Sequence, residues 1–267
     1  MMITGTLTRI SALASNTFLE AVRNRIFIGL LLMTFGFLAF STVLSDLAVR
    51  GESQRVVLDF GLFSMSLCGV LIAIVMGVIL LYKEVEKKTI YTLLSKPVGR
   101  VEVIVGKYIG MLMVLGAGMA LMITLWVMIL AYKGTDVTLD HGLAGLLLFF
   151  EVMIVAAVAM VFSAFSSPVL SGLFTFGIFG LGRLLYLIEE MLESSKGFFI
   201  NNPGLRGPAE AFVAICPDLS VFNVSQDLLQ GIPVTGAYVG SAFGYSLAFV
   251  VCLLSIASVL FLRRDFT

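Results

Sequence analysis

Residues 83–107 read KEVEKKTIYTLLSKPVGRVEVIVGK, with six basic and three acidic side chains in a chain that is 59% hydrophobic. Only 13% of the whole chain is charged, against about 25% in an ordinary soluble domain, and its mean hydropathy is +1.06. The bilayer is therefore the expected solvent of the chain, and the charged segment is expected outside it. The fold class that follows is an all-α membrane protein, with residues 1–267 in a single domain.

Six apolar runs lie around this segment, each near the length of about 20 residues that a helix needs to cross a bilayer. The predicted spans are residues 26–46, 60–82, 106–131, 143–166, 169–188 and 237–262. Residues 189–236 hold four of the six prolines between short apolar pieces. We expect short helices there, on the outer side of the membrane, none long enough to span.

Basic residues predict the orientation, because cytoplasmic loops are enriched in Lys and Arg. If the N terminus is cytoplasmic, eleven basic residues lie inside and five outside. The inside set is Arg9, Arg23, Arg25, the six within 83–107, Arg263 and Arg264, and the outside set is Arg50, Arg55, Lys133, Lys196 and Arg206. We therefore predict both termini and residues 83–107 on the cytoplasmic side.

Residues 82–95 have the pattern of an amphipathic helix. Val85, Thr89 and Leu93 follow Tyr82 at helical spacing, while the opposite face is polar. Pro97 then ends the helix, because the residue before a proline avoids helical geometry. A solvated, positively charged loop is the alternative interpretation, but the apolar face and the proline favour an element that docks on a membrane surface or a partner protein. The following VGRVEVIV is expected to be a short turn leading to the third span.

The same segment resembles the signature between the second and third spans of ABC-2 type transporter permeases. The matching residues are Glu86, Thr89, Leu93, Leu94, Ser95, Pro97, Val98, Arg100, Gly106 and Lys107. Ile90 and Gly99 depart from the common pattern in a way that resembles the branch labelled multicopper-enzyme maturation permeases. Residues 6–25 resemble the family's amphipathic N-terminal helix, and FLRRDF at 261–266 resembles its basic C-terminal end.

The resemblance implies a permease subunit of an ATP-binding-cassette exporter in the inner membrane of a prokaryote. Residues 83–105 would form its cytoplasmic coupling segment, which docks on an ATPase chain that binds ATP and Mg. The assembly would contain two ATPase copies and a second permease copy, identical or paralogous. The coupling residues carried over are Glu84, Glu86, Lys87, Lys88, Thr89, Leu93, Leu94, Pro97 and Arg100.

The chain shows no catalytic motif of its own. A phosphate-binding loop needs G-x-x-x-x-G-K-[ST], but Val101 replaces the first glycine and Tyr108 follows Gly106-Lys107. The single histidine, His141, has no Cys or Glu at ligand spacing, so we expect no metal and no bound cofactor. Zero net charge argues against a nucleic-acid partner. We expect a non-catalytic subunit.

Two ionisable residues fall within predicted spans. Glu151 lies eight residues into the fourth span, and Arg183 lies near the outer end of the fifth. At 1.5 Å per residue both are expected roughly 10–12 Å below the outer surface, so we predict an ion pair between them. The pair would fix helix packing or line a path for a polar cargo. Rival partners for Arg183 are Glu189, Glu190 and Glu193.

Gly236, Gly240 and Gly244 begin the sixth span at a spacing that lets helices approach closely, within the chain or between chains. The main alternative function is a secondary transporter or channel, whose helices are typically broken or polar near the membrane midplane. Uniformly apolar spans do not favour that alternative. The identity of the cargo stays open.

Overall fold

The computed structural model describes residues 2–48, 52–86, 99–193 and 203–263, in which every regular element is helical. The α-helices are α1 (Met2–Val22), α2 (Arg25–Leu47), α3 (Ser53–Glu86), α5 (Arg100–Tyr132), α6 (Leu139–Phe165), α7 (Pro168–Arg183), α8 (Leu185–Glu193), α10 (Pro203–Ile215), α11 (Ser225–Leu229) and α12 (Gly236–Arg263). A 3₁₀ turn, η1 (Ser220–Phe222), precedes α11. The expected all-α fold class is confirmed.

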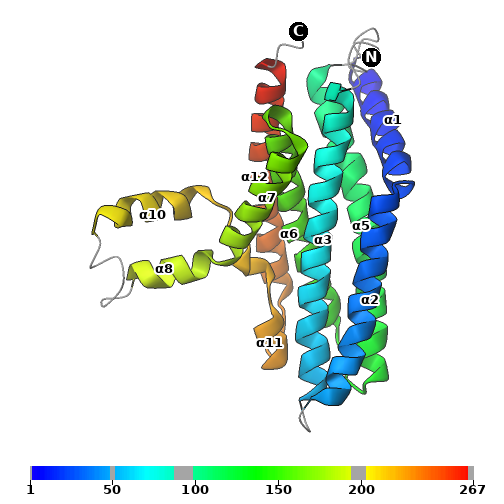
Figure 1. The fold of residues 1–267 in the computed structure, drawn as a ribbon, viewed down its shortest axis with the longest axis vertical. Coiled ribbons are helices and arrows are strands. Elements are labelled where there is room, and N and C mark those ends of the chain that lie inside the picture. The colour runs from blue at the N-terminus through cyan, green and yellow to red at the C-terminus, as the bar shows by residue number, and fades with distance from the viewer. Residues whose placement is uncertain (1, 49–51, 87–98, 194–202, 264–267) are drawn as a thin grey trace.

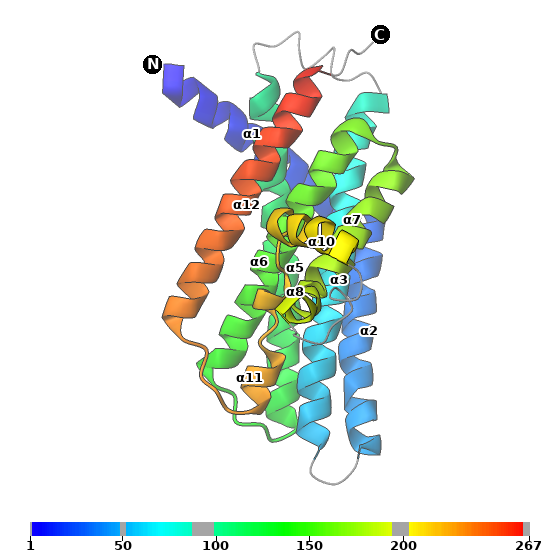
Figure 2. The same cartoon turned by 90° about the vertical axis from the view of Figure 1, so that its left-hand side faces the viewer.

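The long helices form an elongated bundle (Figure 1). Helix α1, the end of α3, the start of α5 and the end of α12 lie at one end, which we call the terminal end. The opposite end, which we call the far end, carries the α5–α6 connection and α11 (Figure 2). The two helix ends that border residues 87–98 therefore lie at the same end of the molecule as the start of α1.

Within the described residues, five helices are long and apolar enough to cross a membrane: α2, α3, α5, α6 and α12. The expected fifth span, 169–188, is not one straight helix. Helix α7 ends at Arg183, and α8 leaves at an angle of 48° to it. The count reaches six only if this bent pair is taken as one span.

Helices α3 and α5 begin well before their apolar runs. Helix α3 begins at Ser53 rather than at residue 60, and α5 begins at Arg100 rather than at 106. The expected short turn at VGRVEVIV was therefore wrong for residues 100–105, which form the first turns of α5, while Val98 lies outside the described residues. Glu102 stabilises this start by accepting a hydrogen bond from the Gly99 N–H at 3.1 Å, which satisfies a donor at the helix N-terminus.

Helix α6 is the central helix of the bundle, and most of its side chains are buried against α3, α5, α7 and α12. Small residues permit the close contact with α3. A Cβ on Gly77 would lie only 2.7 Å from the Cβ of Ala159. Trp126 of α5 is fully buried and donates from its indole N–H to the Val57 carbonyl at 3.3 Å. It fits beside α3 because Gly61 has no side chain there.

Helices α8 and α10 form an arm that projects sideways from the middle of the bundle (Figures 1 and 2). They pack on each other, and α8 also contacts α7. The chain then returns to the bundle through η1, which contacts α6, and continues to α11 at the far end. The segment expected to hold short helices does hold them, but the arm starts at Leu185 rather than at residue 189.

Candidate functional site

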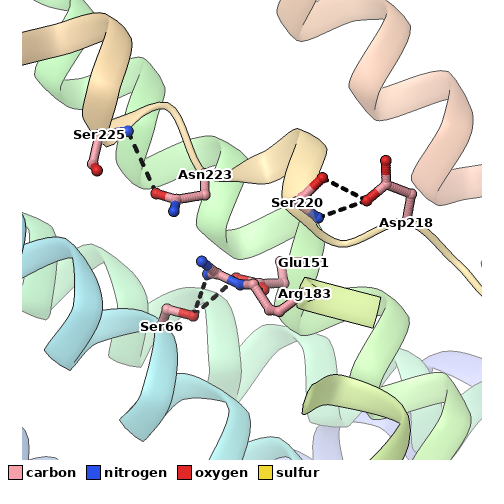
Figure 3. Close-up of polar contacts among 7 residues, drawn as sticks. All are labelled: Ser66, Glu151, Arg183, Asp218, Ser220, Asn223 and Ser225. Carbon is pink, nitrogen blue, oxygen red and sulfur yellow. Dashed lines mark hydrogen bonds and ion pairs between the residues drawn. The ribbon is translucent and has the colours of Figure 1, made fainter. Parts of the chain in front are cut away.

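Arg183, Glu151 and Ser66 form a polar cluster where α7 ends (Figure 3). The Arg183 guanidinium donates from Nε to Glu151 Oε1 at 2.6 Å and from Nη2 to Oε2 at 2.8 Å. Nη2 also donates to Ser66 Oγ at 2.7 Å, and that hydroxyl donates to Glu151 Oε2 at 3.0 Å. Three helices, α3, α6 and α7, thus meet in one hydrogen-bonded unit.

The structure brings Glu151 and Arg183 together as the sequence analysis expected, and adds Ser66, which that analysis missed. Glu151 is fully buried, whereas 22% of the Arg183 side chain is exposed. A bidentate Arg–carboxylate pair is among the strongest polar contacts in proteins. Because one partner is wholly desolvated, losing the other would leave an uncompensated buried charge. Glu189 and Glu190, the described rivals, are exposed on α8.

The break after Arg183 has a local cause. The backbone leaves helical geometry at Leu184, and the Gly182 carbonyl accepts a hydrogen bond from the Leu219 N–H at 3.1 Å. A Cβ on Gly182 would lie 2.8 Å from the Pro217 carbonyl oxygen. The returning chain therefore packs directly on the last turn of α7. It supplies a donor for a carbonyl that an unbroken helix would have satisfied itself.

The cluster lies farther from the start of its helix than the predicted span suggested, because α6 begins at Leu139 rather than at residue 143. Glu151 follows the start of α6 at Leu139 by twelve residues, which at 1.5 Å each is about 18 Å along the helix. It therefore lies near the middle of α6, where an unpaired charge is most costly in a bilayer. The same depth applies to the α7–α8 break, because Arg183 is the last residue of α7.

A second contact joins the terminal-end helices α1 and α5. A Cβ on Gly110 would lie 2.5 Å from the Ala14 carbonyl oxygen, and one on Gly106 would lie 2.8 Å from the Leu13 Cβ. Ala14 and Thr17 are buried there. Gly106 and Gly110 form a G-x-x-x-G pair that lets two helix backbones touch. This spacing was the only signal of the contact in the sequence, and it does not identify α1 as the partner.

The family profile described as ABC-2 family transporter protein matches residues 11–266, almost the whole chain. The chain belongs to the ABC-2 transporter family. This confirms the family that the segment 83–107 had indicated, while the multicopper-maturation branch stays a prediction. No curated protein matches the chain significantly.

Family membership and the apolar helices identify an integral, multi-pass membrane permease. Permeases of this family are generally non-catalytic subunits that work with an ABC ATPase. Among the described residues, no group of three or more His, Cys, Asp or Glu side chains is placed to hold a metal ion. Burial raises the pKa of the Cys216 thiol, which disfavours the nucleophilic thiolate.

Most of the coupling segment expected in the permease lies outside the described residues. That applies to Lys87, Lys88, Thr89, Leu93, Leu94 and Pro97. Glu84 and Glu86 belong to the last turn of α3, and Arg100 is the first residue of α5. The segment is thus bounded by two long helices, each continuous with a candidate span.

The glycines at the start of α12 do not pack against any described part of the permease. A Cβ on Gly236, Gly240 or Gly244 would meet no described atom within 4 Å. Helix α12 instead contacts α6 through a different face, which buries Ala242, Ser246 and Val250. Of the two alternatives left open for these glycines, close packing within the described part of this chain is therefore excluded.

Proposed function

We propose that this chain is the membrane subunit of an ATP-driven exporter in a prokaryotic inner membrane. Residues 83–105 would couple it to an ATPase on a separate chain, which would bind ATP and Mg. The family match carries this proposal. With the N terminus inside, the terminal end faces the cytoplasm, where residues 87–98 could reach the ATPase.

The helices offer a rigid mechanical path from that segment into the membrane. Helix α3 contains both Glu86, at its end, and Ser66 of the polar cluster. Twenty residues of continuous helix separate them, which is about 30 Å. A displacement at the end of α3 would therefore act on the contact between α3, α6 and the end of α7.

Helix α5 provides a parallel path. It begins at Arg100, directly after the coupling segment, and is held against α1 at Gly106 and Gly110. Arg9 of α1 also pairs with Glu102 of α5, with 3.7 Å between Nη1 and Oε2. A force on the start of α5 would move α1 with it, since neither helix can slide without separating this close contact.

The proposed assembly contains two permease copies and two ATPase copies. The open glycine face of α12 supports a helix–helix contact with another chain, because small residues permit such contacts in membranes. The arm also exposes large apolar side chains, including Tyr186, Met191 and Ile215. Cargo would cross at or near the contact between the permease copies.

One observation favours the alternative of a secondary transporter. The break between α7 and α8 places an Arg–Glu pair beside interrupted backbone deep in the bundle. That arrangement is typical of binding sites in secondary transporters, and the apolar sequence of the fifth span had not indicated it. The family match still favours ATP-driven transport.

Purification of the tagged chain from its native host in mild detergent tests the proposal. We expect an ABC ATPase subunit at a ratio of roughly one to one. The double substitution Glu84→Ala/Glu86→Ala should loosen or remove it, because these are the best candidate polar contacts on the permease side. Glu189→Ala/Glu190→Ala on the arm is the matched control and should retain the ATPase.

The outcome separates the two functions. A permease that purifies alone, with no ATPase encoded beside it, would contradict the ABC mechanism. Flux driven by an ion gradient in liposomes, abolished by Glu151→Gln, would then support the secondary transporter. Loss of the ATPase in both double variants would show that the effect does not arise at the coupling segment.

A further inference from the structure

A cavity of about 550 Å³ lies at the far end of the bundle. Its walls come from the start of α3, the α5–α6 connection, the start of α6 and the chain around α11. Leu58, Leu228 and Ile232 give it an apolar side. The volume falls within the range of small-molecule sites, about 300–1,000 Å³. The polar cluster at Glu151 is separate, about 15 Å farther along α6 from His141.

The polar lining of the cavity is predominantly acidic. Among the described residues of the lining, Glu52, Asp136 and Asp140 contribute three carboxylates, and Arg55 contributes one guanidinium. Arg55 is already paired with Glu52 at 3.2 Å. Asp140 accepts hydrogen bonds from the Val234 N–H and the Thr138 hydroxyl and lies in the first turn of α6, where the helix N-terminus favours a carboxylate, but no described Lys or Arg pairs with it. The cavity therefore favours a cation.

His141 adds a donor that has no partner among the described residues. It is only 6% exposed and lines the cavity. Its Nδ1 accepts a hydrogen bond from the Thr138 N–H at 3.2 Å, so the proton of the neutral ring lies on Nε2. Nε2 makes no hydrogen bond to a described residue, and it is not one of the fully buried polar atoms that lack a partner. Its N–H is therefore open to the cavity and can donate to a ligand there.

We infer that this cavity binds a protonated amine that carries a neighbouring hydroxyl or carbonyl oxygen and a small apolar group. The amine would lie near Asp136 and Asp140, the oxygen would accept from His141 Nε2–H, and the apolar group would lie against Leu58 and Ile232. None of the residues that would hold the amine belongs to the coupling segment, so binding at this cavity does not depend on an ATPase.

The chain contains its own reporter for the test. Trp126 is the single tryptophan, and its ring lies 5.8 Å from the His141 ring, centroid to centroid. A ligand on His141 should therefore change tryptophan fluorescence. The probe is 2-(cyclohexylamino)ethanol, a cationic amino alcohol that does not absorb in the tryptophan range. Cyclohexylacetate, which has the same ring and a negative charge, is the matched control ligand.

We expect a saturable fluorescence change with the amine and none with cyclohexylacetate. Asp136→Asn/Asp140→Asn retains the hydrogen-bond acceptors but removes both charges, and should weaken binding about tenfold. His141→Asn retains an acceptor for the Thr138 N–H but removes Nε2–H, and should weaken binding about fivefold. Glu210→Gln removes an exposed charge on the arm and should leave affinity unchanged. Each variant is compared only after its melting temperature without probe matches the parent.

Three results would overturn the inference. They are the absence of a saturable change, equal binding of the anionic control, and unchanged affinity in the double Asp→Asn variant. If the double variant melts early, the single Asp136→Asn variant replaces it, because Asp136 is exposed and its side chain has no hydrogen bond or ion pair with a described residue. A loss of the ATPase in Glu84→Ala/Glu86→Ala would not alter the fluorescence response to the amine. A failure of the amine site can therefore be distinguished from a failure of the proposed ATPase coupling.

Discussion

The centre of α6 and the arm carry glutamates in opposite surroundings. Glu151 is fully buried, and both of its oxygens are paired within the chain. Glu189 and Glu190 on α8 are exposed, next to apolar side chains such as Tyr186 and Met191 that are exposed as well. The bundle thus supplies the partners of Glu151 itself, whereas the surroundings of the arm have to come from the membrane or from partner chains.

The largest expected effect comes from removing one partner of the buried Glu151–Arg183 pair. Glu151→Ala leaves Arg183, which lies beside the middle of α6, without its carboxylate partner. Arg183→Ala leaves the fully buried carboxylate of Glu151 without its guanidinium. Each should lower the free energy of unfolding by about 3–5 kcal/mol. Thermal or denaturant unfolding of the purified permease in detergent measures this loss.

The double variant Glu151→Leu/Arg183→Leu is the control for that prediction. It removes both charges and restores apolar volume, so it should recover most of the lost stability. A strong non-additive coupling between the two positions would show that the pair acts as a unit. Single variants that lose less than about 1 kcal/mol, the upper range for an exposed pair, would contradict the buried setting.

An intermediate effect distinguishes a glycine that packs against another helix from a glycine that meets no described atom. Gly110→Ala places a Cβ 2.5 Å from the Ala14 carbonyl oxygen, so α1 has to shift, at a cost of about 1–3 kcal/mol. Gly240→Ala on α12 meets no described atom and should stabilise the isolated chain by up to about 1 kcal/mol. Unfolding of the two variants side by side checks the sign. Equal changes in the free energy of unfolding would contradict the conclusion that the glycine of α5 packs closely on another helix and the glycine of α12 does not.

Hydropathy predicted the five continuous candidate spans, because the need to satisfy backbone groups in lipid is met within each helix. It did not predict the end of α7 at Arg183. That break depends on Leu219, which is remote in sequence yet donates to the Gly182 carbonyl. The Glu151–Arg183 pair was predictable from two charges in neighbouring apolar runs. Ser66 was not, because many serines occur in the spans and only the fold selects one.

The start of α5 also differs from the sequence prediction, but here the helix is longer than predicted rather than shorter. The charged and apolar residues of VGRVEVIV lack the uniform hydropathy of a span, so the apolar pattern placed the helix boundary six residues too late. Helical structure there depends on the Glu102 contact with the Gly99 N–H and on the packing of α1. The contact between His141 and Trp126 likewise joins two helices whose sequences do not point to each other.

The smallest expected effect concerns an exposed ion pair on the arm. Arg206 and Glu210 form an i,i+4 pair at 2.8 Å on α10, with both side chains 55% exposed. Arg206→Ala should therefore cost the isolated permease only about 0.3–0.5 kcal/mol, measured by unfolding in detergent. The same substitution in the assembled transporter decides what surrounds the arm. A loss several times larger there would mean that a second chain covers the pair, because only desolvation strengthens such a contact. Equal losses would place the pair in water or lipid headgroups, and the arm would then not be part of the contact between permease copies.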